Sequence, residues 1–423
     1  MLSEYFDSAE RIEEFRAGRA GPFFEGFARK LYEAGYAEIT ARRHLRAAEH
    51  LIYWAGRRDT AVGNLTEESL ERFGRHFGRC RCARYGRSHR VDLVNGARLF
   101  FKHLRDLDLL AVSDVRPVVQ DPPLLSEFRD WMRQQRGTRE ITLVNYSNHI
   151  RPLLRRLGEK PEKFDAKGLR QFVLDVSRGS GWARAKTCTT ALRMFLRFLI
   201  AEGKCATGLD AAVPVLPHWR LSVLPRYFQA EEVERLIASC DLASPVGRRD
   251  RAILLLLARL GLRAGDIVQL RLGDIDWKSA WVCVSGKGRR QARLPLTQEV
   301  GKALVAYLKH GRPQTHADAM FIRSRAPFRA FRSHAAVSVI VAQAIRRAGV
   351  TRPSRGAAHL LRHSVATSML RQGASLQDVA TLLRHRSIET TQIYAKVDVT
   401  ALQKIAQPWP EVELCYAKPW NRT

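Results

Sequence analysis

The sequence predicts a mainly α-helical, multidomain protein that contains one small antiparallel sheet. The chain has 423 residues, which is enough for two or three domains of ordinary size. Apolar residues recur at helical spacing through most of the chain. One region, residues 276–296, instead reads as short strands joined by a glycine-containing turn. Helices therefore dominate the expected fold, and the sheet is a local addition to it.

The composition indicates a partner that carries many negative charges. Lysine and arginine number 71 against 42 acidic residues, a formal net charge of +29 that favours nucleic acid. The longest apolar runs, such as residues 252–258, end at arginines and are too short to cross a membrane. The N-terminus lacks the basic and apolar segments of a signal peptide, and an odd number of cysteines, seven, does not suggest a disulfide framework. An intracellular protein without a membrane partner is expected.

The N-terminal half contains two similar stretches. Three blocks recur in the same order: residues 38–54 match 140–157, residues 65–73 match 164–172, and residues 98–104 match 193–199. Such ordered self-similarity predicts a duplicated small helical domain, each copy with four or five amphipathic helices. The two copies would be joined near Asp121, which is followed by two prolines.

Both copies place many basic residues opposite their apolar faces. A charged helix face is usually only solvated. In the second copy, however, Lys186, Arg193 and Arg197 fall on successive helical turns. Together with the net charge of the chain, this spacing predicts contact with the DNA backbone.

The first copy also contains a cysteine- and histidine-rich loop. His76, Cys80, Cys82 and His89 lie within fourteen residues and are the side chains that hold structural zinc in other proteins. The Cys-x-Cys spacing is tighter than that of ordinary zinc ribbons, and the surrounding arginines repel a cation. These features favour an arginine-rich loop with free thiols, so that no bound metal is predicted.

After the second copy the chain changes character. Residues 206–226 lose helical periodicity and carry three prolines, which predicts an interdomain connection. A helix then begins at Gln229, and residues 250–260 form a strongly apolar helix suited to a core. That helix ends at Arg263, with Asp266 close enough along the chain to hold the guanidinium. An arginine at a helix end also has a purely structural explanation, the helix dipole.

The expected hairpin places a lysine at its tip. Residues 280–285 and 291–296 read as its strands, and Lys287 lies between two glycines in the turn. A lysine in such a turn is usually only solvated. Helices over residues 298–310 and 333–348 are expected to follow.

The strongest chemical signal lies in residues 359–394. A helix over residues 359–372 would end at Gly373, and Ser375 with Asp378 resembles a capping box that opens the next helix. That helix would end near His385, and Ser387 is placed to cap a third short helix that carries Tyr394.

This stretch suits phosphate chemistry. His359 and Arg362 share a helix face and offer a proton carrier beside a fixed cation. Guanidinium groups match phosphate oxygens, and a tyrosine hydroxyl can act as a covalent nucleophile, so a phosphodiester is the expected substrate. His359 and His363 also have the spacing of a zinc-binding helix. Zinc is not favoured there, because Leu360 stands where that pattern needs a glutamate.

The same residues resemble the C-terminal signature of the tyrosine recombinases, the phage integrase family. The family pattern is His-x-x-Arg-His, a helix, Leu-Gly-His and then the tyrosine nucleophile, and the matching positions are His359, Arg362, His385 and Tyr394. The Gly-Leu-Arg-x-x-Asp stretch around Arg263 and the Gly-Lys-Gly hairpin are similar to two further family motifs. Arg384 departs from the pattern, because the family usually has glycine before the histidine.

The resemblance implies a helical, SAM-like core-binding region followed by a mixed α/β catalytic domain. The expected parts are an extra DNA-binding or assembly domain, a core-binding domain, a linker, a catalytic domain and a tail, at residues 1–120, 121–208, 209–226, 227–407 and 408–423. The implied catalytic residues are Arg263, Lys287, His359, Arg362, His385 and Tyr394. Further contacts to DNA are expected from Arg289, Arg290 and Arg384.

The resemblance also implies a reaction. Tyr394 would attack the scissile phosphate to form a 3′-phosphotyrosyl link, with His359 accepting the tyrosine proton and Lys287 protonating the leaving 5′ oxygen. No metal or cofactor is expected. The expected partners are double-stranded DNA, further copies of the chain in a tetramer, and sister recombinases of a mobile element, in the cytoplasm at the bacterial nucleoid. Two alternatives remain open: a catalytically silent DNA-binding protein and a type IB topoisomerase.

Overall fold

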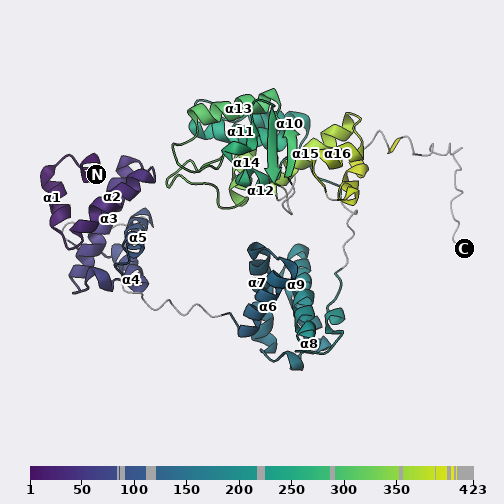
Figure 1. The fold of residues 1–423 in the computed structure, drawn as a ribbon, viewed down its shortest axis with the longest axis horizontal. Coiled ribbons are helices and arrows are strands. Elements are labelled where there is room, and N and C mark those ends of the chain that lie inside the picture. Colours follow the sequence, from purple (N-terminus) through teal and green to yellow (C-terminus); the bar gives the residue numbers. More distant parts are fainter. Residues whose placement is uncertain are drawn as a thin grey trace, which may run out of the picture. The chain divides into compact units, whose positions relative to one another are not determined.

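The computed structural model describes residues 1–82, 85, 91–110, 121–216, 224–285, 291–351, 356–385, 387–397, 402–403 and 406, without the side chains of residues 91–93. Lys287, Arg289, Arg290, His89 and the predicted tail therefore lie outside the described residues. The chain divides into two compact units, Val112–Arg220 and the combination of Met1–Ala111 with Leu221–Thr423. Figure 1 shows the helices and strands along the chain.

The first helical part has an aromatic core. Its elements are η1 (Leu2–Glu4), α1 (Ala9–Ala17), α2 (Gly21–Glu33), α3 (Glu38–Gly56), η2 (Val62–Asn64), α4 (Glu67–Phe77) and α5 (Val91–Asp106). Phe24 of α2 stacks on Phe100 of α5 at a centroid distance of 4.9 Å, and Phe27 meets the same ring edge-on. Burial of these rings holds the amphipathic helices together.

The second helical part is organised in the same way. Its elements are α6 (Pro123–Arg136), α7 (Glu140–Leu157), η3 (Pro161–Lys163), α8 (Ala166–Gly179), α9 (Trp182–Ala201) and η4 (Leu209–Ala212). Leu209 and Val213 are buried in its hydrophobic core. The packed part thus continues past residue 208, into a segment that the sequence assigned to the linker, because its apolar residues fall on a short 3-10 helix.

The order of elements repeats between the two helical parts. The series α2, α3, η2, α4, α5 in the first part corresponds to α6, α7, η3, α8, α9 in the second. Even the caps agree, since Thr66 caps α4 and Asp165 caps α8 through a side-chain oxygen that accepts a backbone N–H. These features support the duplication that the sequence predicts.

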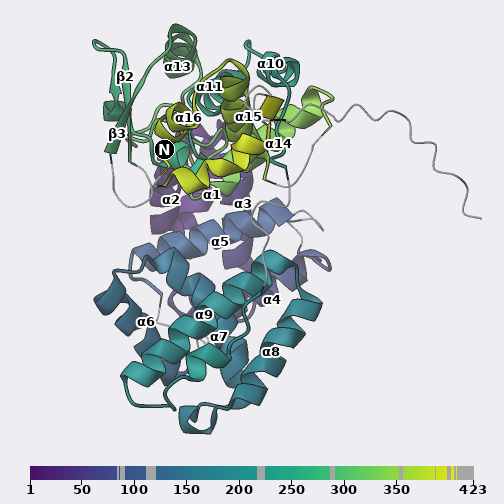
Figure 2. The ribbon, with the colours of Figure 1, turned by 90° about the vertical axis from the view of Figure 1, so that its right-hand side faces the viewer.

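The C-terminal part combines helices with the sheet. Its elements are α10 (Ala230–Ala238), α11 (Pro245–Arg259), α12 (Ala264–Gln269), η5 (Leu272–Asp274), β1 (Ile275–Asp276), β2 (Trp281–Ser285), β3 (Gln291–Pro295), α13 (Gln298–His310), α14 (Ala335–Arg347), α15 (Ala357–Arg371), α16 (Leu376–Leu382), η6 (Ile388–Thr390) and η7 (Gln392–Val397). The strands are antiparallel in the order β1-β2-β3. The longer two, β2 and β3, run side by side in Figure 2, with Val282 opposite Leu294.

Helix α11 forms the centre of this part. Its residues 252–257 are fully buried, and they pack with α13, α14 and α15 in one hydrophobic core. The mainly helical fold with one small antiparallel sheet is the fold class that the sequence predicts, and it is confirmed. Within the described residues, no helix is both long and apolar enough to cross a lipid bilayer.

Candidate active site

Five of the six predicted catalytic residues lie in the described C-terminal part. Arg263 stands at the start of α12, His359 and Arg362 are on α15, His385 follows α16, and Tyr394 is on η7. Lys287, the sixth, lies outside the described residues. Hydrogen bonds to shared carbonyls and mutual effects on pKa connect these five side chains in one cluster.

Local sequence signals bring these elements together. Helix α15 ends just before Gly373, which has a φ of 89°, a left-handed conformation that glycine adopts without a steric penalty. Ser375 and Asp378 then form the predicted capping box at the start of α16. Ser387 caps the 3-10 helix η6, and Tyr394 follows on a second 3-10 helix, η7.

The predicted nucleophile is buried and hydrogen-bonded. Tyr394 is 2% exposed, and its hydroxyl shares a hydrogen bond of 2.7 Å with Nδ1 of His363. Burial raises the pKa of Tyr394 to about 12, although the charge of Arg362 opposes the shift. Burial, His359 and Arg362 lower the pKa of His363 to about 4. At neutral pH a neutral phenol therefore meets a neutral imidazole.

His363 is the residue that sequence reasoning missed. The resemblance assigned the tyrosine proton to His359, one turn earlier on α15, but His363 holds the hydrogen bond to Tyr394. The two imidazole rings lie 6.5 Å apart, and His359 is exposed. Partial desolvation lowers the pKa of His359, as do the neighbouring guanidinium groups. Sequence spacing alone gave no sign of which histidine reaches a tyrosine on another element.

Arg362 is the most deeply buried cation of this cluster. It is 4% exposed, and its guanidinium donates to the backbone carbonyls of Gly261 and Leu383. Burial, with the positive charges of Arg263 and Arg384, lowers its pKa to about 9. The group is still charged at neutral pH, so three guanidinium groups gather here without a matching number of carboxylates.

Arg263 contacts the same backbone segment, the one that follows α16. Its Nη2 donates to the carbonyl oxygens of Leu383 at 3.4 Å and Arg384 at 3.2 Å. The sequence suggested that Asp266 holds the Arg263 guanidinium, and this is wrong. The Asp266 carboxylate accepts the Arg263 backbone N–H at 2.9 Å and forms an ion pair with Arg384 at 2.5 Å. Asp266 lies in the first turn of α12, where a carboxylate reaches back to the start of its own helix.

Arg384 occupies a backbone position suited to glycine. Its φ of 53° is left-handed, as is typical of the residue after a helix C-terminus. This explains why the family pattern has glycine there. The Arg384 side chain is turned inward, toward Asp266, and its Nε and Nη1 are buried without a hydrogen-bond partner among the described residues. The predicted contact of Arg384 with DNA is not tested by this geometry.

His385 is positioned by a residue that the sequence did not single out. Its Nδ1 shares a hydrogen bond of 2.7 Å with Oγ1 of Thr391, which is completely buried. Burial lowers the pKa of His385 to about 4, and the charges of Arg362 and Arg263 act in the same direction. The hydrogen bond from Thr391 thus orients the His385 ring through Nδ1, and Nε2 takes no part in it.

The basic residues predicted on the second helical part have partners within it. Arg193 donates to the carbonyls of Val213 and Pro214, both at 2.9 Å, which gives it a structural role at the end of the packed part. Arg197 forms an exposed ion pair with Asp210. The ammonium of Lys186 lies 4.9 Å from the centroid of the Trp182 ring. Their predicted contact with DNA stays a prediction.

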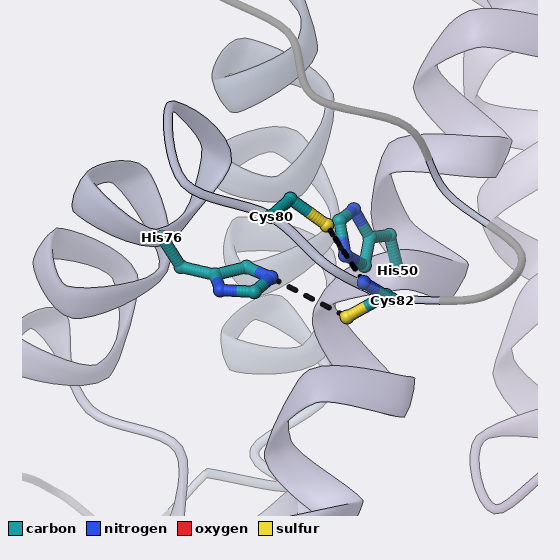
Figure 3. A group of neighbouring side chains, drawn as sticks. All are labelled: His50, His76, Cys80 and Cys82. Atoms are coloured by element: carbon teal, nitrogen blue, oxygen red, sulfur yellow. Dashed lines mark hydrogen bonds between the residues drawn. The ribbon is translucent and has the colours of Figure 1, made fainter.

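The metal-ligand candidates of the first helical part also come together. His76, Cys80 and Cys82 gather with His50 of α3, while His89 lies outside the described residues. This group is shown in Figure 3.

Comparison with known proteins identifies the relatives of this chain. The Phage integrase family matches residues 226–400, a range that contains all six predicted catalytic positions. A Sinorhizobium fredii protein named "Putative integrase/recombinase y4rA" is 34% identical over 91% of this chain and 93% of its own length. The chain belongs to the phage integrase family of tyrosine recombinases. It is a site-specific recombinase.

One further relative and two solved structures match shorter parts of the recombinase. Tyrosine recombinase XerD of Mycobacterium tuberculosis is 33% identical over 66% of this chain and 95% of its own length. Among solved structures, XerH bound to its palindromic difH substrate covers 81% of the recombinase and 96% of XerH, with a TM-score of 0.54 and 21% identity. A lambda integrase (75–356) dimer bound to a COC′ core site covers 69% of the recombinase and 98% of that chain, with a TM-score of 0.52 and 20% identity. These structures agree with the fold described above.

Proposed function

We propose that this recombinase breaks and rejoins DNA strands through a covalent 3′-phosphotyrosyl link on Tyr394. The observation that carries the proposal is the setting of the Tyr394 hydroxyl, which is bonded to a neutral imidazole near a group of guanidinium ions. A cluster in which guanidinium groups outnumber the neighbouring carboxylates suits a phosphodiester, whose negative charge increases in the transition state.

The proposed cleavage step conserves the number of phosphate ester bonds. The Tyr394 oxygen attacks phosphorus, the bond from phosphorus to the 5′ oxygen breaks, and a free 5′-hydroxyl is released. Arg263 and Arg362 stabilise the charge on the non-bridging oxygens, and His385, oriented by Thr391, donates a hydrogen bond from Nε2. Lys287 protonates the leaving 5′ oxygen. A 5′-hydroxyl of a second strand then reverses the step and completes strand exchange.

The proton of Tyr394 passes to His363 in this proposal rather than to His359. The 2.7 Å hydrogen bond supports this choice. The pKa values of about 12 for Tyr394 and about 4 for His363 oppose the transfer without DNA. A phosphate bound beside these side chains would favour imidazolium and so raise the pKa of His363. Proton transfer would therefore wait for bound substrate.

The remaining roles concern assembly. Double-stranded DNA suits the net charge of +29, and DNA contacts from Lys186, Arg289, Arg290 and Arg384 belong to the same proposal. A lambda integrase tetramer bound to a Holliday junction supports a tetrameric assembly for strand exchange. The extra helical part before residue 121 would serve DNA binding or assembly. The proposed context is integration, excision or transposition of a mobile element, alone or with sister recombinases.

The decisive experiment uses nicked duplexes made from the DNA that flanks the gene. The full chain is incubated with them and resolved on a denaturing gel, beside Tyr394→Phe and Tyr227→Phe. The Tyr227 hydroxyl accepts a hydrogen bond from Arg371 and belongs to none of the predicted catalytic positions, so its variant controls for loss of a phenol. We expect a covalent adduct with the parent chain and with Tyr227→Phe, and none with Tyr394→Phe. Bound DNA that never becomes covalent on any flanking segment would contradict the proposal and favour a silent DNA-binding protein.

A second readout separates recombination from strand relaxation. The adduct is offered a labelled strand with a free 5′-hydroxyl. Transfer to that strand is expected of a recombinase. Relaxation of a supercoiled plasmid without any transfer would instead indicate topoisomerase activity.

A further inference from the structure

The first helical part contains a cluster of metal-ligating side chains that has no part in the proposed reaction. His50 lies on α3, His76 lies near the end of α4, and Cys80 and Cys82 follow α4 (Figure 3). Two separate stretches of chain, α3 and residues 76–82, therefore converge on one point. Neither cysteine forms a disulfide.

The distances between the ligand atoms suit one tetrahedral ion. The four atoms all lie within 4.8 Å of one another. Nε2 of His50 is 3.5 Å from Sγ of Cys80, and Nε2 of His76 is 3.4 Å from Sγ of Cys82. A tetrahedral zinc ion with Zn–N bonds of about 2.0 Å and Zn–S bonds of about 2.3 Å needs about 3.6 Å between a nitrogen and a sulfur ligand. Two of the distances between nitrogen and sulfur ligands are therefore already close to those of a zinc site.

The surroundings hold the ligands in position. His50 is 2% exposed, and its ring stacks on Tyr85 at 4.2 Å and meets the edges of Phe73 and Phe77. The backbone N–H of Cys82 donates to Sγ of Cys80 at 3.4 Å, a bond that also stabilises a metal-bound thiolate. Cys80 and Cys82 are 3% and 9% exposed.

The neighbouring arginines are compatible with such an ion. A Zn²⁺ ion with two thiolates and two neutral imidazoles has no net charge. Arginines beside the site therefore meet no excess positive charge. A surface hollow lined by Arg57, Arg58 and Trp54 borders His76 and Cys82, which gives an ion a path to the ligands. Repulsion by the surrounding arginines, which argued against a metal in the sequence analysis, therefore does not exclude a zinc ion at this site.

We propose that His50, His76, Cys80 and Cys82 bind one Zn²⁺ ion that ties α3, α4 and the segment after α4 together. Four protein ligands complete a tetrahedron and leave no open position, so the ion is structural. The sequence pointed to three of these ligands and chose His89 as the fourth. His50 was missed because it lies on a different helix, far from the others along the chain.

The test begins with the full chain, reduced and reconstituted with zinc. We expect one zinc per chain by elemental analysis after exhaustive dialysis. Cobalt in place of zinc should give the strong visible bands of a tetrahedral site and a thiolate-to-cobalt band in the near ultraviolet. Removing zinc with a chelator should lower the melting temperature, because the ion binds only the folded state. None of these readouts depends on recombination, so failure of the zinc proposal and failure of the proposed function are separable.

Variants assign the ligands. Cys82→Ser should lose the zinc, and Cys205→Ser, which changes a free cysteine of the second helical part, should keep it. His76→Cys supplies a third thiolate and should retain zinc while the near-ultraviolet cobalt band strengthens. This variant keeps the test informative if Cys82→Ser does not fold. Absence of zinc from the reduced, reconstituted parent chain would overturn the proposal, as would equal zinc content in the parent and Cys82→Ser.

Discussion

Two clusters of histidines in this chain have opposite surroundings. His363 and His385 lie among guanidinium groups beside Tyr394, whereas His50 and His76 lie beside two thiols. Burial lowers the pKa of the histidines in both places, so the imidazoles are neutral at pH 7. The neighbours therefore decide the use of each cluster. Positive neighbours suit a phosphate, and thiols suit a cation.

The largest expected effect comes from removing the buried cation of the candidate active site. Arg362→Ala should lower the rate of covalent adduct formation by about 10²-fold to 10³-fold or more, because it removes charge stabilisation from a buried site. It should also lower stability, since the carbonyls of Gly261 and Leu383 lose their donor. Arg371→Ala, on the same helix but exposed, is the matched control and should leave cleavage near the parent rate. Similar cleavage rates for Arg362→Ala and the control would break the comparison, because the positive surroundings would then have no chemical role.

The next largest effect distinguishes the two histidines of α15. We expect His363→Gln to slow cleavage by about 10²-fold, the size typical of a lost general base. His359→Gln should have a smaller effect, because His359 does not contact the Tyr394 hydroxyl in this structure. Single-turnover rates on a nicked duplex measure both. The reverse order of effects would return the role of proton acceptor to His359.

Acid should destabilise both clusters. The pKa values of His50, His363 and His385 are each lowered to about 4, below the value of about 6.5 expected in an unfolded chain. The unfolded state then binds protons more readily, so this stability is fully present above about pH 6.5 and is lost as the pH falls toward 4. Melting temperatures at pH 7.5, 6 and 5 should fall by several degrees in total. Stability that stays constant over this range would contradict the burial of these imidazoles in neutral form.

The two clusters also differ in how well the sequence predicted them. Motif spacing singled out His359, Arg362, His385 and Tyr394 as candidates, and the structure brings these four residues together. Contacts between elements that are distant along the chain were not predicted from the sequence. The bond from His363 to Tyr394, the place of Thr391 beside His385 and the entry of His50 into the cysteine cluster depend on packing between elements. Capping signals such as Ser375 with Asp378 were reliable because they act within a few residues.

In the two similar helical parts, too, the sequence predicted local structure better than features that depend on several elements. The ordered blocks of the sequence matched helices α3, α4 and α5 to α7, α8 and α9, since apolar periodicity is a local property. The functional difference between the copies was harder to read. Residues 78–90 connect α4 to α5 and carry both cysteines, whereas only residues 180–181 connect α8 to α9. In the aligned blocks, moreover, His50 corresponds to Pro152, and the same offset continued past residues 65–73 places Asp175 opposite His76, so the second copy lacks these two histidines.

The smallest expected effect concerns Arg384, which supplies positive charge to the active-site cluster from a backbone conformation suited to glycine. Arg384→Gly and Arg384→Ala both remove the ion pair with Asp266, but only glycine relieves the left-handed φ of 53°. The glycine variant should therefore be more stable than the alanine variant by about 1 kcal/mol. Urea denaturation of the two variants at one pH measures this difference, in which the loss of the ion pair cancels. Equal stabilities would mean that the left-handed conformation at residue 384 costs nothing. In that case the inward-turned arginine would have to be explained by its charge alone.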